Sequence, residues 1–489
     1  MAEGRRADIG IVGLAVMGQN LALNILEHGF VTCIYNRTSD KTKEFLNAEG
    51  KGKDFMVAYT LKNLVDSLKV PRIVMLLVKA GTAVDEVLSK LVSLLEPGDV
   101  IIDGGNSEYI DSTRREKKLK AKQLLYVGSG VSGGEKGARH GPSLMPGGNI
   151  EAWPLIKNIF QSISAQADGA PCCEWVGPEG AGHFVKMVHN GIEYGDMQLI
   201  SEAYHIMKQV LKLNNDAIGE IFEQWNRTEL ESYLVEITAE ILKFHDEDDQ
   251  SLLDKIVDKA GQKGTGKWTT LSSLEYGIPL TLVGEAVFAR CLSELKEERM
   301  LASKCLKGPD NLTSNYPTCS KEEFVEDIRK ALYASKIISY SQGFMLMRNT
   351  NCAFGWKLNL GGIATIWKGG CIIRSKFLGD IKRAFDREPN LVNLLFNEFF
   401  TEAVHSCQES WRRVISYSVL LGIPVPAFST ALAFFDGYRS SWLPANLIQA
   451  QRDYFGAHTY KRSDHPDEPV HTDWTKSPSK QSPAPAAQP

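Results

Sequence analysis

The chain has 489 residues, 43% hydrophobic and 23% charged, so it is long enough for two or three domains with buried cores. Its formal net charge of −4 argues against a general nucleic-acid-binding protein, which would be distinctly basic. No apolar segment suits a signal peptide or approaches the roughly 20 residues of a membrane span. The nine scattered Cys residues favour reduced thiols. We therefore expect a cytoplasmic protein that binds neither nucleic acid nor membranes.

Short β-rich runs alternate with helical stretches from residue 8 to about residue 179. We expect strands at Ile9–Val12, Val31–Tyr35, Ile73–Leu77, Val100–Asp103 and Leu124–Val127. Helices are expected between them, among others at Gly18–His28, Ala83–Leu95 and Ser112–Lys122. This alternation predicts a Rossmann-type, doubly wound parallel α/β domain over residues 1–179.

Long helical patterns replace the alternation after about residue 180. Thr228–Glu231 is expected to be a capping box for a helix whose apolar face carries Leu230, Leu234, Ile237 and Ile241. Ser320–Glu323 repeats this signal before a helix that could extend to Met347. We therefore predict a large all-α domain over residues 180–439.

The composition changes again at about residue 440, where the chain becomes polar and proline-rich. The segment SPSKQSPAPAAQP, residues 477–489, is expected to be disordered. The segment QAQRDYFGAHTY, residues 449–460, is too aromatic for a passive linker, so it should pack on something. Residues 440–489 are thus expected to form a C-terminal tail.

A glycine-containing turn follows the first expected strand. It consists of Gly13, Leu14, Ala15, Val16, Met17 and Gly18. Ala15 stands where the G-x-G-x-x-G motif has its second glycine, so the motif alone is also compatible with a structural turn. Its place between a strand and a helix favours a dinucleotide site, because the N-terminus of the helix can hold a pyrophosphate.

The end of the second expected strand indicates which dinucleotide is bound. NAD enzymes usually carry Asp or Glu there, whereas this chain has Asn36, Arg37 and Thr38. An arginine can accept the 2′-phosphate of NADP, which a carboxylate would repel. A solvated surface arginine is the plainer alternative. We predict NADP, with the nicotinamide half near Val78, Lys79, Ala80 and Asn106.

Three long segments resemble the 6-phosphogluconate dehydrogenases. They are GSGVSGGEKGARHGPSLMPGG (128–148), GHFVKMVHNGIEYGDMQ (182–198) and IVDKAGQKGTGKW (256–268). With GLAVMG, NRT, GGCIIRS and QRDYFGAH, the likeness covers roughly residues 7–460. The resemblance implies an NADP-dependent enzyme that oxidises and decarboxylates 6-phosphogluconate.

The second of these segments also carries a helical pattern. Lys186, Asn190, Glu193 and Tyr194 share one helical face with His183. A base, an acid and an amide would then point at one ligand, although a solvated face is the alternative. By resemblance, Lys186 is the base for the C3 hydroxyl, and Glu193 is the acid that returns the enediol to the ketone. This chemistry needs no metal, and the sequence offers no ligand cluster such as HExxH.

The substrate contacts follow from the resemblance as well. The carboxylate and hydroxyl contacts would be Asn106, Ser132, Gly133, Gly134 and Asn190, with His183 nearby. The phosphate contacts would be Tyr194, Lys263, Thr265, Arg290 and Arg452, and His458 would complete the site. In this family the tail crosses to the other subunit, so a homodimer would be the functional unit.

The proposed chemistry requires unusual ionisation of two side chains. The pKa of Lys186 must lie well below that of a free lysine, and Glu193 must stay protonated part of the time. Two residues depart from the family pattern: Lys136 stands where a second Glu is common, and Lys368 replaces an Arg. The Lys136 change could alter the affinity for anionic ligands, and the Lys368 change is expected to be structural.

Two other functions are compatible with parts of this pattern. Another β-hydroxyacid dehydrogenase, such as one acting on 3-hydroxyisobutyrate, would not need the phosphate cluster or the long second domain. A catalytically silent NADP-binding protein would be expected to lack Lys186 or Glu193, and both are present.

Overall fold

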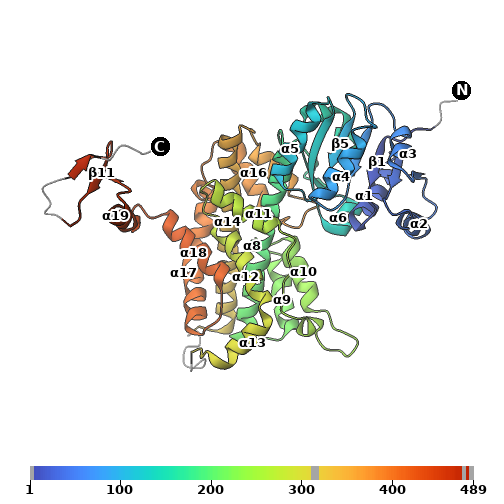
Figure 1. Ribbon diagram of the computed structural model, residues 1–489. Helices are drawn as coiled ribbons and strands as arrows, with labels where there is room; N and C mark the ends of the chain where they lie inside the picture. Colours follow the sequence, from blue (N-terminus) through green and yellow to red (C-terminus); the bar gives the residue numbers. More distant parts are fainter. Residues whose placement is uncertain (1–4, 310–318, 476–480, 484–489) are drawn as a thin grey trace. The chain divides into compact units, whose positions relative to one another are not determined.

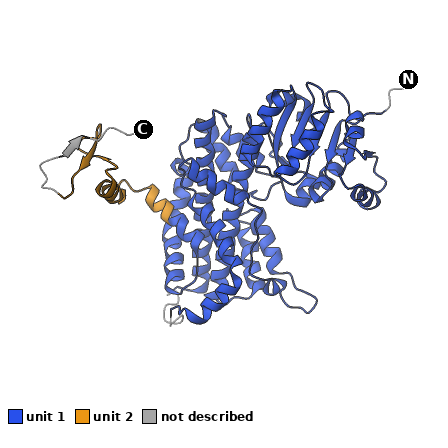
Figure 2. Cartoon of the chain, in the orientation of Figure 1, with its two compact units in different colours: residues 1–432 blue, residues 433–489 orange. Residues whose placement is uncertain are grey.

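The structure is a computed structural model that describes residues 5–309, 319–475 and 481–483 (Figure 1). The chain divides into two compact units, residues 1–432 and residues 433–489 (Figure 2). The larger unit contains both the sheet and the long helices. We propose that the sheet and the long helices form two domains that meet near residue 180, and that the C-terminal tail begins near residue 440.

A sheet with the strand order β3-β2-β1-β4-β5-β6-β7 forms the first part of the larger unit. Its strands are β1 (Ile9–Val12), β2 (Thr32–Tyr35), β3 (Met56–Val57), β4 (Ile73–Leu76), β5 (Val100–Asp103), β6 (Leu125–Ser132) and β7 (Ser143–Gly148). Neighbouring strands are parallel from β3 to β6, whereas β7 is antiparallel to β6. The five predicted strands are confirmed, although β6 continues to Ser132. The sequence does not predict β3, which is very short, or β7, whose Pro and Gly residues disfavour a strand pattern.

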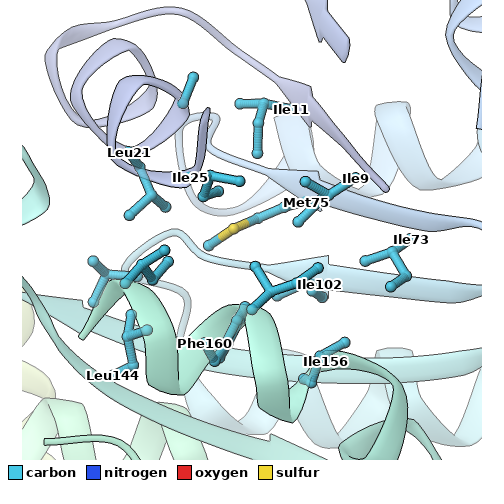
Figure 3. Packing of buried hydrophobic residues seen from close by; sticks show 14 of the residues in the cluster. Ile9, Ile11, Leu21, Ile25, Ile73, Met75, Ile102, Leu144, Ile156 and Phe160 are labelled. Atoms are coloured by element: carbon cyan, nitrogen blue, oxygen red, sulfur yellow. The ribbon is translucent and has the colours of Figure 1, made fainter. Parts of the chain in front are cut away.

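Helices cover both faces of this sheet, as a doubly wound fold requires. They are α1 (Val16–Glu27), α2 (Ser39–Asn47), α3 (Leu61–Asp66), α4 (Thr82–Leu91), α5 (Tyr109–Lys120), α6 (Gly134–His140) and α7 (Trp153–Ile163), with the 3₁₀ helix η1 (Ile150–Ala152). The strands β8 (Gln166–Ala167) and β9 (Ala170–Pro171) form a separate two-stranded hairpin. Met75 of β4 packs with Ile25 of α1 and Phe160 of α7 in one core (Figure 3). Its neighbour Leu76 points to the opposite face and packs in a second core with Leu88 of α4.

Long helices form the rest of the larger unit (Figure 1). They are α8 (Ala181–Gln209), α9 (Asn215–Trp225), α10 (Tyr233–Leu242), α11 (Thr265–Glu275), α12 (Thr281–Glu294), α13 (Lys296–Cys305), α14 (Lys321–Phe354), α15 (Leu360–Ile366), α16 (Leu378–Arg387) and α17 (Glu398–Leu420), with the 3₁₀ helices η2 (Leu252–Lys255) and η3 (Leu394–Phe396). Helix α18 (Pro426–Tyr438) begins in the larger unit and ends in the smaller one. Within the described ranges, none of the helices has the length and apolar character needed to cross a bilayer.

Helix α8 connects the sheet to the helical part. It contacts β6 and β7 as well as α11, α12 and α14, and most of its residues are buried. Asp196 of α8 forms a buried ion pair with Lys336 of α14. Losing either partner would leave an uncompensated buried charge, so this pair fixes the position of α8 against α14.

The two predicted capping boxes have different outcomes. Ser320 caps α14 as expected, and its backbone N–H donates to Glu323 Oε2 at 2.8 Å, although the helix extends past Met347 to Phe354. The capping box at Thr228 is wrong. Ser232 caps α10 instead, and the Thr228 hydroxyl donates to the Trp225 carbonyl at 2.6 Å in the preceding turn.

The smaller unit contains α19 (Ala445–Gly456) and the strands β10 (Tyr460–Lys461), β11 (Pro469–Thr472) and β12 (Gln481–Pro483). The three strands form an antiparallel sheet. Strand β12 lies in the segment 477–489 for which disorder is expected, so that prediction is wrong for these three residues. The rest of that segment lies outside the described residues.

Candidate active site

A cavity of about 300 Å³ lies at the carboxyl ends of β1, β2 and β4. This edge of an open parallel sheet is where such folds bind dinucleotides. Eight of the predicted cofactor residues line the cavity: Gly13, Leu14, Ala15, Asn36, Arg37, Thr38, Val78 and Lys79. The predicted loops thus meet in one place, with the Arg37 side chain exposed at the surface.

The turn after β1 is held against the loop after β2. Gly13 has a φ of 106°, and a Cβ atom there would overlap the Leu77 carbonyl oxygen, so the turn requires glycine. The Leu14 amide donates to Asn36 Oδ1 at 3.1 Å. Ala15 is the N-cap of α1 and has no side-chain cap, so the first amides of this helix are available to an anion.

Five predicted cofactor residues do not line this cavity. Val16, Met17 and Gly18 form the first turn of α1, while Ala80 and Asn106 lie in the loops after β4 and β5. Conversely, Lys41 of α2 and Lys90 of α4 line the cavity although the sequence does not single them out. Lys41 lies only three residues beyond Thr38, and that proximity was the available signal.

Lys186 lies inside the larger unit, where its side chain passes directly over β6. The residue is 6% exposed. A Cβ atom at Gly130 would lie 2.8 Å from Lys186 Cγ, closer than real Cβ atoms come to such a neighbour. Only glycine at this point of β6 leaves room for the lysine side chain.

His189 connects Lys186 to two predicted substrate residues. Its Nδ1 lies 3.4 Å from Lys186 Nζ and 3.0 Å from Asn190 Oδ1, and its Nε2 lies 3.1 Å from Ser132 Oγ. Asn190 Oδ1 can only accept a hydrogen bond, so Nδ1 carries the ring proton and Nε2 accepts from the Ser132 hydroxyl. Sequence reasoning missed His189, although it lies one helical turn from both Lys186 and Glu193.

The predicted substrate residue His183 has a different environment. It is buried, and its Nδ1 lies 2.6 Å from Ser112 Oγ of α5. Burial lowers the pKa of this imidazole, which favours its neutral form. The structure therefore brings His189, rather than His183, into contact with Lys186, Ser132 and Asn190.

The titratable groups of α8 have shifted pKa values, in the directions that the predicted chemistry requires for Lys186 and Glu193. Burial lowers the pKa of Lys186, although the negative charge of Glu193 opposes this shift. Burial raises the pKa of Glu193, while Lys186 and Arg290 oppose that shift. Burial also lowers the pKa of His189 well below its usual range, and the positive charge of Lys186 adds to the effect.

The predicted phosphate residues of the larger unit lie on α8 and α12, at the start of α11 and in the loop before it. The Arg290 guanidinium lies 3.6 Å from the centre of the Tyr194 ring and donates to the Gly261 carbonyl at 3.1 Å. Asn190 Nδ2 donates to Thr265 Oγ1 at 3.1 Å. Lys263 is exposed on the loop before α11. Thr265 thus contacts the cluster through Asn190, and Arg290 stacks on Tyr194 of the same helix.

The remaining predicted site residues lie after β5, at the start of α6 or in the smaller unit. Gly133 is the N-cap of α6 with a φ of 110°, and Gly134 follows it. Asn106 is exposed after β5. Arg452 and His458 belong to the smaller unit. Of the two departures from the family pattern, Lys136 is exposed on α6, and Lys368 forms an ion pair with Asp168.

Two family models together match almost the whole chain. One is described as the NAD binding domain of 6-phosphogluconate dehydrogenase and matches residues 8–177; the other is described as 6-phosphogluconate dehydrogenase, C-terminal domain, and matches residues 182–474. A decarboxylating 6-phosphogluconate dehydrogenase from Rattus norvegicus is 65% identical over 471 residues, which cover 96% of this chain and 97% of the relative. One from Saccharomyces cerevisiae is 60% identical over 476 residues, with coverage of 96% and 97%.

A solved structure shows the same architecture. It is a Plasmodium falciparum 6-phosphogluconate dehydrogenase, studied in its apo form, with its cofactor NADP+ and with its substrate 6-phosphogluconate. The similarity has a TM-score of 0.91 at 47% sequence identity and covers 96% of this chain and 100% of that one.

Proposed function

Because the chain belongs to the 6-phosphogluconate dehydrogenase family, we propose that it oxidises 6-phospho-D-gluconate with NADP, releasing D-ribulose 5-phosphate and carbon dioxide. The observation that carries this proposal is the buried cluster of Lys186, His189 and Asn190, with Glu193 beside it. The same chemistry is implied by relatives named decarboxylating and by the Plasmodium enzyme studied with NADP+ and 6-phosphogluconate.

The cofactor cavity has the chemistry that a bound NADP requires. The uncapped N-terminus of α1 would hold the pyrophosphate, and Arg37 would pair with the 2′-phosphate. Lys41 adds a second cation to the same wall. Bound NADP supplies the acceptor for the hydride that leaves C3 of the sugar acid.

Lys186 is the group that moves the first proton. In its neutral form it accepts the proton of the C3 hydroxyl while the hydride leaves C3, so that a ketone forms at C3. The resulting ammonium then stabilises the oxyanion as the C1–C2 bond breaks and carbon dioxide departs. The electrons of that bond form the C2–C3 double bond of an enediol. Lys186 gives its proton to the C3 oxygen and so completes the enediol. Glu193 then donates a proton to C2 while Lys186 takes back the proton of the C3 hydroxyl, so that the enediol becomes a ketone at C3.

The shifted pKa values raise the share of molecules that can begin this sequence. The reaction needs a neutral Lys186 together with a protonated Glu193, which is the reverse of their usual states at neutral pH. The population of this form rises tenfold for every pH unit by which the two pKa values approach each other. Burial shifts both values in that direction.

We also propose that two copies of the chain form the functional unit and exchange their tails. A groove of about 1140 Å³ in the larger unit is lined by apolar residues of α8, α10 and α12. Exposed apolar residues are found at this groove, including Ile241 and Phe288, and on α19, including Ile448 and Phe455. Such large exposed apolar surfaces mark interfaces. Size-exclusion chromatography with light scattering should give twice the chain mass, and a monomer would contradict this proposal.

The cytosol is the compartment that we propose for the protein. The eight cysteines whose side chains the structure describes are all free thiols. Free thiols suit a reducing environment. Fractionation of cells from the source organism would test this assignment.

The reaction itself is tested by NADPH formation, measured by absorbance with 6-phosphogluconate, with and without a chelator. We expect rapid reduction of NADP and release of carbon dioxide, unaffected by the chelator. Lys186→Met should abolish turnover while NADP binding is retained. Lys208→Met is the matched control on the same helix, because Lys208 pairs with Asp254 away from the cluster. Folded wild-type protein that binds NADP but does not turn over would contradict the proposed function.

A further inference from the structure

The smaller unit is organised around one buried carboxylate. Asp453 is the buried residue of α19, with 0% exposure, whereas most of the other described side chains of the smaller unit are exposed. Its Oδ1 accepts from the Thr459 amide at 3.0 Å and lies 2.9 Å from His471 Nδ1. Its Oδ2 accepts from the Thr472 amide at 3.0 Å and from Trp474 Nε1 at 2.9 Å. One side chain thus joins α19, the loop after it and β11.

These hydrogen bonds outweigh the cost of burying the carboxylate. Burial alone would raise the pKa of Asp453, but the bonds from Thr472, His471 and Trp474 lower it below its usual range. The side chain is therefore ionised at neutral pH and accepts from four donors.

The backbone around His458 is held in an unfavourable conformation. Ala457 and Thr459, on either side of it, have φ angles of 49° and 52°, which residues with a Cβ rarely adopt. Such a conformation persists only where neighbouring contacts impose it. Both amides donate to Asp453, that of Ala457 to the carbonyl oxygen at 2.9 Å and that of Thr459 to Oδ1.

A second side chain connects His458 to Arg452. Gln449 Oε1 accepts from Arg452 Nη1 at 3.1 Å. The Nε2 of the same amide donates to the carbonyl oxygens of His458 and Thr459 at 3.4 and 2.5 Å. Gln449 therefore fixes the guanidinium relative to the loop that carries the imidazole.

We propose that Asp453 and Gln449 are positioning residues that hold Arg452 and His458 ready for the phosphate and the sugar acid in the partner subunit's site. This inference rests on the proposed function and on the proposed exchange of tails. Arg452 lies in the last two turns of α19, whereas His458 lies in the loop that follows the end of the helix at Gly456. Without the two restraints, substrate binding would have to order this loop, and that ordering would reduce affinity.

Two substitutions test the proposal through the kinetics of the full-length enzyme. Asp453→Asn replaces the carboxylate by an amide, so two of the donors would face an N–H₂ group and the others a neutral oxygen. Gln449→Ala removes the hydrogen bond to Arg452. We expect each to raise the KM for 6-phosphogluconate about tenfold, the effect of losing one hydrogen bond to a charged group. NADP affinity should not change, because the cofactor residues belong to the larger unit. Asp464→Asn is the matched control, since Asp464 pairs with Arg462 on the exposed surface of the same unit.

Mixed dimers separate positioning from general damage to the protein. A hybrid of one Asp453→Asn chain and one Lys186→Met chain has one site that combines an intact Lys186 with an intact tail. That site should show the wild-type KM for 6-phosphogluconate, which neither homodimer can do. Unchanged KM values in both single variants, or a hybrid that keeps the raised KM, would overturn the proposal. Failure of the proposed function is distinguishable, because the wild-type enzyme would then be inactive with the same substrate.

Discussion

The cofactor cavity and the cluster on α8 are built in different ways, although both bind negatively charged ligands in the proposed function. The cations of the cavity, such as Arg37 and Lys79, are exposed and follow the ends of predicted strands. In the α8 cluster, Lys186 and His189 are buried, and their neighbours come from β6 and α11 as well as from α8 itself.

This difference determines how sensitive each region is to substitution. Water and salt screen an exposed charge, so its loss removes one contact from a ligand and little else. A buried charge is already desolvated, and its pKa depends on every neighbour. We therefore expect large effects on turnover from the α8 cluster and smaller effects, confined to cofactor affinity, from the cavity.

After Lys186→Met, Glu193→Gln should give the largest loss of turnover. The amide keeps the size of the side chain but cannot donate a proton to carbon, so we expect kcat to fall at least about hundredfold with KM little changed. In the wild type, activity should fall at low pH as Lys186 becomes protonated and at high pH as Glu193 loses its proton. The high-pH fall should disappear in the variant.

Rates measured across pH for Glu193→Gln, wild type and Glu240→Gln provide the check. Glu240 is exposed on α10, so its substitution should leave the profile unchanged. A wild-type kcat for Glu193→Gln would show that Glu193 is not the acid. The α8 cluster would then be no more sensitive to substitution at this position than the cofactor cavity is.

Gly130→Ala should have the next largest effect, because it pushes the Lys186 side chain away from β6. A displacement of about 1 Å at a reacting group can reduce the rate about hundredfold. We expect kcat/KM to fall by that order while NADP still binds, as measured by fluorescence titration. Gly308→Ala is the control, since a Cβ atom there meets nothing within 4 Å. Wild-type rates for Gly130→Ala would show that the position of Lys186 tolerates this crowding.

Arg37→Ala should act on the cofactor alone. Loss of a charged hydrogen bond to the 2′-phosphate is expected to raise the KM for NADP about tenfold, with kcat unchanged. The KM for NAD, which lacks this phosphate, should hardly change. Lys43→Ala is a suitable control, because Lys43 pairs with Asp40 on the same exposed surface and does not line the cavity. Equal losses for NADP and NAD would show that Arg37 does not select between them.

The same difference explains which features could be predicted from sequence. The cavity depends on short segments next to buried apolar strands, so the strands and eight of the lining residues could be identified. His189 could not be identified in this way, because its contact with Ser132 joins positions 57 residues apart. The signal that was present, its spacing of three residues from Lys186, is shared by any residue on that helical face.

The wrong capping box illustrates a second limit. Thr228 and Glu231 have the right spacing, yet the Thr228 hydroxyl bonds to a carbonyl in the turn before it. Ser232 lies four residues later and caps α10 with comparable local chemistry. Local signals of similar strength compete, and the packing of the helix decides between them.

Lys186→Met also tests the comparison through stability, where we expect the smallest effect. Burial lowers the pKa of Lys186 from 10.5, so below that pH the unfolded chain binds the proton more tightly than the folded chain does. The wild type therefore loses folding free energy at neutral pH, and the loss fades only as pH rises toward 10.5. Methionine is apolar and of similar length and removes this loss, so Lys186→Met should be about 1 kcal/mol more stable at pH 7.

Denaturant unfolding at pH 7 and pH 10 measures this gain in folding free energy, which should shrink at the higher pH. Lys120→Met, on an exposed position of α5, should show no such gain. A Lys186→Met protein less stable than wild type at pH 7 would mean that the lysine contributes more to packing than its burial costs. The contrast between an exposed cavity and a buried cluster would then fail at Lys186.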